Sequence, residues 1–510
     1  MSQPMTRPEP STQSTIEVFN PATRAKVGEV PVQGRAEVAA AVQRARGAQH
    51  EWAARSFRER AKLLYRYRDV LVDNKERIAD VLTSETGKPR GDAYGVELFY
   101  VCDAIGFWAK RAAGFLADQK IRPHLLMTKR VYSTYVPMGV VGIIGPWNFP
   151  LNLTIGDAVP ALMAGNAVVI KPSEVTPFSA LLGVELAGAA GFPEGLLQTV
   201  TGYGQTGGDL VDLVDMVHFT GSVATGKKVA QRATAQLKPV TLELGGKDPM
   251  IVLRDADLER AANAAVWGGL VNAGQVCISV ERVYVEEPVY DAFVHKVVER
   301  VKALRQGLAD GDVDIGSMTF PPQLEKVESH VADAVAQGAK VLTGGRRNPS
   351  LPGLFYEPTV LVDVSHDMTA MRDETSGPTI PIMRVRDEEE AIRLANDSPY
   401  GLGASVWTKD ATRGRALARR IESGAVCVND CLVNYLTVDA PMGGRKESGL
   451  GRRHGAEGIR KYCHQQTVVV DRFGLKSEFF WYPSSPAKRR LVSRALNLLY
   501  RSGWRNRLFG

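Results

Sequence analysis

An alternation of short apolar strands, glycine-bearing turns and helices most constrains how this chain can fold. Residues 140–144 and 167–170 are nearly all apolar, which is typical of strands that are buried on both faces of a sheet. A helix follows the second of them, and further strands at 198–200 and 216–219 each run into a turn with glycine. This order predicts a parallel sheet with crossover helices, and such sheets bind ligands at the carboxyl ends of their strands.

A second alternation of the same kind extends from about residue 262 to residue 428. Residues 35–120 read as helices instead, because apolar positions recur there at spacings of three and four. A chain of 510 residues is too long for one core and is expected to form roughly two to four domains. We therefore expect an α/β protein with two parallel-sheet domains.

Cysteine usage and the N-terminus bear on the compartment. Five cysteines are scattered along the chain without a Cys-x-x-Cys motif, and no pair of histidines has zinc-site spacing. This pattern favours reduced thiols, a cytoplasmic location and no metal site. Residues 1–15 are polar and proline-bearing, lack the apolar stretch of a secretion signal, and are expected to form a frayed tail.

Positive charge is concentrated near the end of the chain. The formal net charge is +7, and seven basic residues with no acidic one follow Glu478. Subtracting these seven from +7 leaves a nearly neutral body, so the charge is not spread along a face as nucleic-acid binding requires. These residues are Lys488, Arg489, Arg490, Arg494, Arg501, Arg505 and Arg507. No nucleic-acid partner is expected.

The tail of residues 476–510 is predicted to contain a basic amphipathic helix, with apolar side chains on one face and arginines on the adjoining face. These two sets are Leu491, Val492, Ala495, Leu496 and Leu499, and Arg490, Arg494, Arg501 and Arg505. The apolar run is too short to span a bilayer, but the helix can lie in the interface as a peripheral membrane contact. Alternatively, its apolar face packs on the protein's own body or on a neighbouring subunit.

The hexapeptide 272–277 (NAGQVC) is the leading candidate for chemistry. It places Cys277 directly after a polar turn with glycine, and an upstream strand-like segment ending in Glu243 can supply a carboxylate nearby. A cysteine on such a loop can be reached by substrate and act as a nucleophile. The alternative is a small buried hydrophobic residue, the commonest role of a free cysteine. The hexapeptide alone does not decide between the two.

Turns with glycine give weaker signals. Residues 221–228 nearly match the phosphate-binding pattern of nucleotide hydrolases, but Lys228 stands where a magnesium-binding hydroxyl is needed. That interpretation is rejected, and a standard G-x-G-x-x-G fingerprint is also missing at this turn. Thr220, Gly221 and Ser222 nevertheless follow a strand and open a helix, a geometry that suits a pyrophosphate. An ordinary strand-to-helix turn uses the same residues.

Several charged residues have two interpretations. Lys171 and Glu174 close a strand together, where a carboxylate can accept ribose hydroxyls, although a solvated surface pair is equally in keeping with the pattern. The same ambiguity applies to Glu374. His218 lies within an apolar strand and is predicted to be a hydrogen-bonded core histidine rather than a catalyst.

Taken together, six motifs resemble the aldehyde dehydrogenase superfamily, and the resemblance extends from about residue 16 to residue 470. The motifs are 146–150 (PWNFP), 171–174 (KPSE), 219–222 (FTGS), 242–247 (LELGGK), 272–277 (NAGQVC) and 441–444 (PMGG). The resemblance implies an NAD(P)-dependent enzyme of the hydrolytic, non-acylating branch, since relatives that transfer the acyl group to coenzyme A usually lack the glutamate found at Glu243.

The resemblance also implies residue roles. Cys277 would be the nucleophile, Glu243 the general base and Asn148 the oxyanion donor. NAD would be the cofactor. Its expected contacts are Trp147, Lys171, Ser173, Glu174, Phe219, Thr220, Gly221, Ser222, Thr225, Gly226, Leu244, Gly245 and Glu374. Ser376 stands where most members carry a phenylalanine near the nicotinamide ribose.

The implied fold has two Rossmann-like domains and a small β element for oligomerisation. Residues 16–121 with 139–244 would form the NAD-binding domain, and residues 245–455 the catalytic domain. Residues 122–138 with 456–475 would pair between subunits in a homodimer or homotetramer.

The substrate is expected to be an apolar aldehyde, aromatic or of medium to long chain. Members that oxidise succinate semialdehyde usually carry two arginines, and the matching positions here are Gly156 and Val271. The expected pocket residues are all apolar: Phe149, Ile278, Leu436 and Met442. Succinate semialdehyde or another small polar aldehyde is the alternative substrate. A non-catalytic scaffold that binds membrane through its tail is an alternative of another class.

Overall fold

The computed structural model describes residues 14–500. The chain forms two compact units. Residues up to 117 and 135–465 belong to the first unit, and 118–134 with the residues from 466 onward belong to the second. A hairpin of β1 (Thr15–Phe19) and β2 (Lys26–Pro31) opens the described chain, so Thr15, expected in the frayed tail, is already in a strand. Residues 1–13 of that predicted tail lie outside the described part.

The predicted parallel sheet is present, with strand order β17-β9-β8-β5-β6-β7. All its strand pairs are parallel except the antiparallel pair of β17 with β9. Its strands are β5 (Val140–Ile144), β6 (Ala167–Lys171), β7 (Leu197–Thr199), β8 (Met216–Thr220), β9 (Val240–Glu243) and β17 (Gly449–Leu450). The sheet therefore takes its last strand from the segment that was expected to belong to the catalytic domain.

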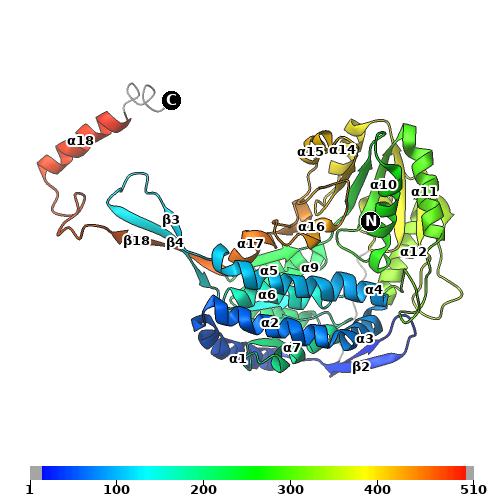
Figure 1. The fold of residues 1–510 in the computed structure, drawn as a ribbon, viewed down its shortest axis with the longest axis horizontal. Coiled ribbons are helices and arrows are strands. Elements are labelled where there is room, and N and C mark those ends of the chain that lie inside the picture. The colour runs from blue at the N-terminus through cyan, green and yellow to red at the C-terminus, as the bar shows by residue number, and fades with distance from the viewer. Residues whose placement is uncertain (1–13, 501–510) are drawn as a thin grey trace. The chain divides into compact units, whose positions relative to one another are not determined.

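Helices cover this sheet, and the helical prediction for residues 35–120 is confirmed up to Phe115. On α2 (Phe57–Asp73) the apolar positions Leu64, Tyr67 and Leu71 are fully buried, and this helix packs against α5 (Phe99–Phe115) and α7 (Phe178–Ala189) (Figure 1). The helices are α1 (Arg35–Ala54), α2 (Phe57–Asp73), α3 (Lys75–Thr86), α4 (Arg90–Asp92), η1 (Ala93–Leu98), α5 (Phe99–Phe115), η2 (Asn152–Gly156), α6 (Asp157–Met163), α7 (Phe178–Ala189), α8 (Gly204–Leu213), α9 (Val223–Thr234) and α17 (Gly455–Arg460).

A second sheet confirms the second alternation, with strand order β12-β13-β14-β11-β10-β15-β16. Its strands are β10 (Asp248–Val252), β11 (Val280–Glu286), β12 (Lys340–Thr343), β13 (Thr359–Val362), β14 (Thr379–Val385), β15 (Ser405–Trp407) and β16 (Cys427–Val428). Its pairs are parallel except for β12 with β13. The accompanying helices are α10 (Leu258–Leu270), η3 (Val271–Gly274), η4 (Glu287–Val289), α11 (Tyr290–Lys302), α12 (Pro321–Ala336), α13 (Thr369–Arg372), α14 (Glu388–Asn396), α15 (Ala411–Ala418), α16 (Val433–Leu436) and η5 (Lys446–Ser448).

A third sheet has strand order β18-β4-β3 and lies mostly in the second unit. Its strands are β3 (Gln119–Ile121), β4 (Lys129–Pro137) and β18 (Cys463–Asp471). Residues 456–465, expected within the oligomerisation element, belong to the first unit. The physical reason is burial, since Ile459 and Tyr462 are fully enclosed in the first core.

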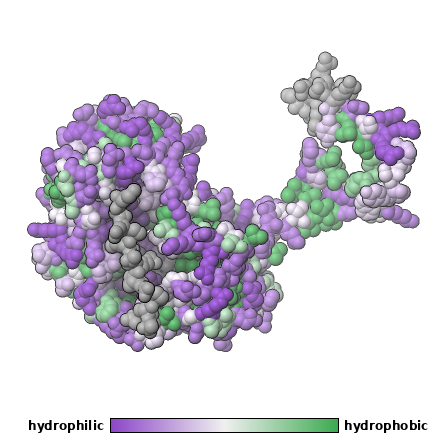
Figure 2. All heavy atoms as spheres, turned by 180° about the vertical axis from the view of Figure 1, so that it is seen from behind, coloured by the Kyte–Doolittle hydropathy of each residue, from purple (hydrophilic) through white to green (hydrophobic). Residues whose placement is uncertain are grey.

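The predicted tail helix is α18 (Pro486–Tyr500). Its apolar residues Leu491, Val492 and Leu496 are exposed, and hydrophobic and hydrophilic surface lie side by side on this unit (Figure 2). Arg501, Arg505 and Arg507 lie outside the described residues. Among residues 14–500, no helix has the length and apolar character that crossing a membrane would require.

Candidate active site

The loop before Cys277 is a constrained turn that follows α10. Asn272, Ala273 and Gly274 all have left-handed backbone angles, with φ of 52°, 55° and 72°. A Cβ atom at Gly274 would lie 2.1 Å from the Gly377 carbonyl oxygen, so only glycine fits there. The Gln275 side chain stabilises the turn: it donates to the Asn272 carbonyl (2.9 Å) and accepts from the Thr319 N–H (2.9 Å). The predicted polar turn before Cys277 is therefore present and rigidly held.

Asn148 lies against this loop. Its side-chain Nδ2 donates to the Gln275 carbonyl at 2.9 Å, and its own carbonyl accepts from Asn272 Nδ2 at 3.1 Å. The buried Lys88 donates to the same Asn148 carbonyl (2.9 Å) and pairs with Glu97 at 2.6 Å. An amide has two N–H donors, so one remains for an oxygen that forms on a substrate. The Asn148 amide thus contacts the loop that carries Cys277, although Asn148 is not among the residues that line the pocket described below, and its role as oxyanion donor stays a prediction.

Glu243 ends β9, as predicted, and the structure also shows that it is buried. Burial raises the pKa of the Cys277 thiol to about 12; Glu243 and Asp248 act in the same direction, while Arg453 opposes them. Burial also raises the pKa of Glu243, and the positive charge of Arg453 is the main opposing influence. The sulfur is thus a protonated thiol at neutral pH and must lose its proton as it attacks.

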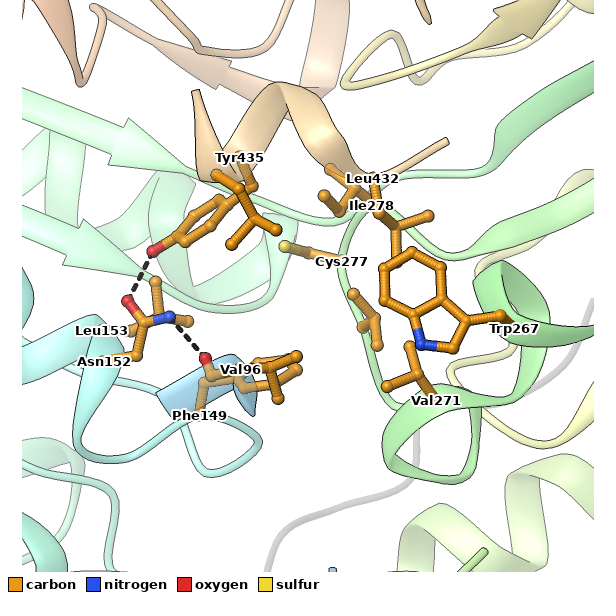
Figure 3. A pocket seen from close by; sticks show the side chains of 12 residues that line it. Val96, Phe149, Asn152, Leu153, Trp267, Val271, Cys277, Ile278, Leu432 and Tyr435 are labelled. Atoms are coloured by element: carbon orange, nitrogen blue, oxygen red, sulfur yellow. Dashed lines mark hydrogen bonds between the residues drawn. The ribbon is translucent and has the colours of Figure 1, made fainter. Parts of the chain in front are cut away.

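A pocket opens in front of the sulfur. Figure 3 shows the Cys277 side chain between Tyr435 on one side and the Trp267 ring on the other. The Tyr435 hydroxyl donates to Asn152 Oδ1 at 2.7 Å, which fixes that part of the wall. The lining residues are Val96, Phe149, Asn152, Leu153, Trp267, Val271, Val276, Cys277, Ile278, Leu432, Tyr435 and Leu436. Among these described lining residues, none carries a charge.

Phe149, Ile278 and Leu436 line the pocket as expected. Met442 is not among the lining residues; it is buried, and its backbone exchanges hydrogen bonds with Arg453 at 2.8 and 2.7 Å. The lining residues that were not anticipated as such are Val96, Asn152, Leu153, Trp267, Val276, Leu432 and Tyr435. They come from separated segments, and only the amphipathic pattern of α10 could have suggested one of them, Trp267, as half-exposed at an apolar site.

The predicted cofactor residues gather at the carboxyl ends of β6 and β8 and at the start of α9. Lys171 Nζ and Glu174 Oε2 pair at 3.1 Å beyond β6. Ser222 is the N-cap of α9 and accepts from the Thr225 N–H; because Ser222 is exposed, an anion can reach the positive end of this helix. A carboxylate that can accept hydroxyl groups and a helix N-terminus that can accept an anion are the groups that binding of an adenine dinucleotide needs.

Close packing brings the remaining predicted contacts together. A Cβ atom at Gly245 would lie 2.4 Å from Glu374 Oε2, and one at Gly226 would lie 2.4 Å from the Leu244 side chain. Burial raises the pKa of Glu374 to about 7. The other predicted contacts occupy the same region: Phe219 lies against Gly221, the Trp147 carbonyl accepts from Thr176, Ser173 caps the Val175 N–H, and Thr220 ends β8.

Two further residues singled out in the sequence are Ser376, which replaces the usual phenylalanine, and His218, which was predicted to be a core histidine. Ser376 has a left-handed backbone (φ 48°), and its N–H donates to the buried Glu281 at 2.7 Å. His218 is fully buried, lies 3.1 Å from Asp157, and has a pKa lowered by burial to about 4. The prediction of a hydrogen-bonded core histidine is confirmed. All five cysteines are free thiols.

Comparisons with known proteins agree with this geometry. The model of the "Aldehyde dehydrogenase family" matches residues 9–468. A Mycobacterium ulcerans (strain Agy99) protein with the name "Putative succinate-semialdehyde dehydrogenase [NADP(+)] 2" is 44% identical over 464 residues, covering 90% of this chain and 89% of that protein. The "4,4'-diapolycopene aldehyde oxidase" of a Methylomonas species is 39% identical over 490 residues, covering 96% and 92%.

Among solved structures, an aldehyde dehydrogenase of Mycobacterium tuberculosis complexed with NAD+ superposes with a TM-score of 0.87 at 36% identity, covering 92% of this chain and 97% of that one. An NADP-dependent enzyme of E. coli gives a TM-score of 0.86 at 37% identity, covering 90% and 95%. Family model, sequence relatives and solved structures agree over nearly the whole chain. The chain therefore belongs to the aldehyde dehydrogenase family and is an NAD(P)-dependent dehydrogenase of that family.

Proposed function

We propose that this enzyme oxidises an apolar aldehyde, aromatic or of medium to long chain, to the carboxylic acid with NAD as the cofactor. The single observation that carries the proposal is the pocket in front of Cys277, whose twelve described lining residues include no charged side chain. Such a pocket stabilises a hydrocarbon chain or ring by removing it from water. The relative named for 4,4'-diapolycopene aldehyde supports the same substrate class.

The first half of the reaction forms a thioester on Cys277. The thiol proton passes to solvent as the sulfur attacks the aldehyde carbon and forms the carbon–sulfur bond of a thiohemiacetal oxyanion. The Asn148 amide and the Cys277 backbone N–H stabilise this oxyanion. NAD, when bound, supplies the acceptor for the hydride that leaves when the oxyanion collapses to the thioester.

The second half hydrolyses the thioester. Glu243 takes a proton from a water molecule while the water oxygen attacks the thioester carbon. The carbon–sulfur bond then breaks, the carboxylic acid leaves, and the Cys277 sulfur takes up the proton held by Glu243, which restores the thiol and the ionised carboxylate. This half needs an ionised Glu243, so the environment of that carboxylate controls its rate.

A small polar substrate is the competing assignment, because the Mycobacterium ulcerans relative is named for succinate semialdehyde. The second carboxylate of that substrate would enter this pocket without a cation to pair with, and burying an unpaired charge is costly. Val271, at one of the two positions where an arginine would be expected, lines the pocket, whereas Gly156 is not in the lining. These facts favour the apolar substrate.

Measuring kcat/KM for decanal, benzaldehyde and succinate semialdehyde tests the proposed substrate class. The wild type should prefer the best apolar aldehyde by roughly 10²-fold, which corresponds to about 3 kcal/mol of transition-state binding. Val271→Arg should lower the value for decanal and raise it for succinate semialdehyde, and Val271→Leu is the matched control that changes size without charge. A wild type that prefers succinate semialdehyde would refute the apolar assignment.

For the cofactor, we propose that NAD is preferred over NADP. Glu174, which pairs with Lys171 at 3.1 Å, would accept the ribose 2′-hydroxyl. A 2′-phosphate would bring about two negative charges against this carboxylate. We expect wild-type kcat/KM to favour NAD by at least about tenfold, and Glu174→Gln to narrow that ratio. Glu185→Gln, which removes an exposed glutamate paired with Arg77, is the control. Equal wild-type values for the two cofactors would contradict the role of Glu174.

We propose that the tail docks on anionic membrane and that the enzyme otherwise resides in the cytoplasm. Exposed Leu491, Val492 and Leu496 on α18 would enter the interface, and the neighbouring Lys488 and Arg490 would face anionic headgroups, at about 1 kcal/mol per cation. An apolar aldehyde partitions into membrane, so this contact would bring enzyme and substrate together.

Deletion of residues 484–510 tests the tail. We expect the wild type to co-sediment with phosphatidylserine-containing vesicles at low salt and the truncated enzyme to stay in the supernatant. Activity on acetaldehyde should be unchanged, while activity on vesicle-borne hexadecanal should fall several-fold because its local concentration falls. A wild type that never pellets with these vesicles would exclude the membrane contact. A truncated enzyme that loses decanal activity without vesicles would favour the tail as a cover of the pocket.

The assembly is proposed to be a homodimer or homotetramer. β18 is an edge strand of its sheet, and the valines Val468, Val469 and Val470 on it are exposed. An exposed apolar edge strand is a template for pairing with another copy of the chain.

A further inference from the structure

Behind Glu243, a buried group of charged and polar side chains surrounds Arg453. Arg453 Nη2 lies 3.1 Å from Asp157 Oδ2 on α6, and Nη1 donates to the Tyr435 hydroxyl at 2.8 Å. Nη2 is also within 3.3 Å of His218 Nε2 and Thr220 Oγ1. These contacts use the end of the guanidinium and fix its plane, because the groups come from three separate elements, α6, β8 and α16.

The Nε atom of this guanidinium makes none of these hydrogen bonds. Arg453 Nε and Glu243 Oε1 are both buried, and neither has a hydrogen-bond partner among the described residues. The two atoms lie 4.0 Å apart. A charge-assisted hydrogen bond has a length of about 2.8 Å, so a side-chain shift of roughly 1 Å would satisfy both atoms at once.

The charges around Glu243 also favour an interaction with Arg453. Glu243 must be ionised to accept a proton from water, whereas burial raises its pKa and thereby favours the neutral acid. The positive charge of Arg453 is the largest influence that lowers this pKa. Asp157 in turn balances the guanidinium, and Arg453 holds the pKa of Asp157 well below its ordinary value.

Resting on the proposed roles of Cys277 and Glu243, we propose that Arg453 is a positioning residue for thioester hydrolysis. Its Nε–H binds the Glu243 carboxylate and holds it, ionised, at the rear of the active site. Tyr435 connects this arrangement to the substrate pocket, since its hydroxyl accepts from Arg453 and donates to Asn152. The same guanidinium thus anchors the pocket wall and the base.

The test follows the acyl-enzyme directly. Enzyme with NAD and decanal is quenched at intervals, and the thioester on Cys277 is measured by mass spectrometry beside NADH formation. For Arg453→Gln we expect NADH to form in the first turnover at the wild-type rate and hydrolysis of the thioester to be slowed by about tenfold or more, because the base is mostly protonated. The acidic limb of the hydrolysis rate should move to higher pH. Arg453→Lys keeps the positive charge, so the acidic limb of its hydrolysis rate should lie between that of Arg453→Gln and that of the wild type.

Other titratable groups near Glu243 must be separated from this effect. Those that face it are Arg453, Lys461, Asp157, Arg452 and Cys277. Burial lowers the pKa of Lys461 to about 8, so its titration overlaps the range of interest. Lys461→Gln is therefore measured in parallel, and the limb assigned to Glu243 should persist in that variant.

Removal of Arg453 alone leaves the buried Asp157 without its hydrogen-bonded cation, and Lys461 is then the positive group that still acts on it. The double variant Asp157→Asn/Arg453→Gln removes both charges and is expected to fold, bind NAD and acylate, yet still hydrolyse slowly. Arg460→Gln, whose side chain donates to the Phe115 carbonyl at 3.0 Å, is the matched control and should hydrolyse at the wild-type rate. Wild-type hydrolysis with an unmoved pH limb in the double variant would overturn the inference. A wild type that forms no thioester on Cys277 would instead contradict the proposed function.

Discussion

Replacing Cys277 with alanine should abolish aldehyde oxidation while leaving NAD binding intact. The sulfur is the only group proposed to bond to the substrate, whereas the expected ribose and pyrophosphate contacts at Lys171, Glu174 and Ser222 lie on other elements. We expect kcat/KM to fall by about 10³-fold or more, as for other enzymes that lose a covalent nucleophile. Steady-state kinetics measure the loss, and titration calorimetry with NAD measures binding.

Cys427→Ala is the matched control for this variant. Cys427 is also a half-buried thiol with a pKa raised by burial to about 11, but it is not in the pocket lining. It should retain activity close to the wild type. If Cys277→Ala keeps more than about a thousandth of wild-type kcat/KM, the nucleophile has been assigned to the wrong residue.

Replacing Glu243 with glutamine should stop the reaction after one turnover. Acylation does not need this carboxylate, so NADH should appear in a burst of about one equivalent per active site. Hydrolysis should then fall by at least about 10²-fold, because glutamine cannot take the proton from water. Rapid-mixing fluorescence of NADH gives both the burst and the steady rate.

Glu281, on β11 of the second sheet, provides a structural comparison for Glu243. It is also a buried glutamate, but it pairs with Lys247 at 2.6 Å and accepts from the Thr375 and Ser376 N–H groups. Glu281→Gln should lower the melting temperature without producing a burst. A Glu243→Gln enzyme with a full steady rate and no burst would show that another group activates the water.

Features formed by residues that are neighbours in the sequence could be predicted from the sequence. The runs at β5, β6 and β8 are mostly apolar, and turns with glycine follow β5 and β8, so the parallel sheet was predictable. Cys277 and the left-handed turn before it lie in one hexapeptide, and Gly274 is needed for a turn that only glycine can make. The resemblance to the family then supplied Asn148 and Glu243 on separate elements.

The pocket and the buried charges could not be predicted in the same way. Tyr435 and Asn152 are 283 positions apart, and Arg453 and Asp157 are 296 apart, yet each pair is hydrogen-bonded. An arginine in a polar, glycine-rich segment reads as exposed, and an aspartate at a helix start reads as a cap. Only the folded chain brings them together behind Glu243, where burial makes each dependent on the other.

In the tail, the helix was predictable from the sequence, but what covers its apolar face was not. Its amphipathic pattern was readable because α18 is one continuous helix, and the exposed Leu491 and Leu496 agree with that pattern. What covers the apolar face depends on a partner, and a periodic pattern within one helix carries no information about which partner that is.

The most direct test of the central claim is to identify the covalent intermediate. Glu243→Gln enzyme is mixed with NAD and decanal, quenched in acid, digested and examined by mass spectrometry. The account predicts a decanoyl group on the peptide that contains Cys277, in an amount equal to the NADH released in the burst. NADH formation with no acylated peptide, or with the acyl group on another residue, would contradict it.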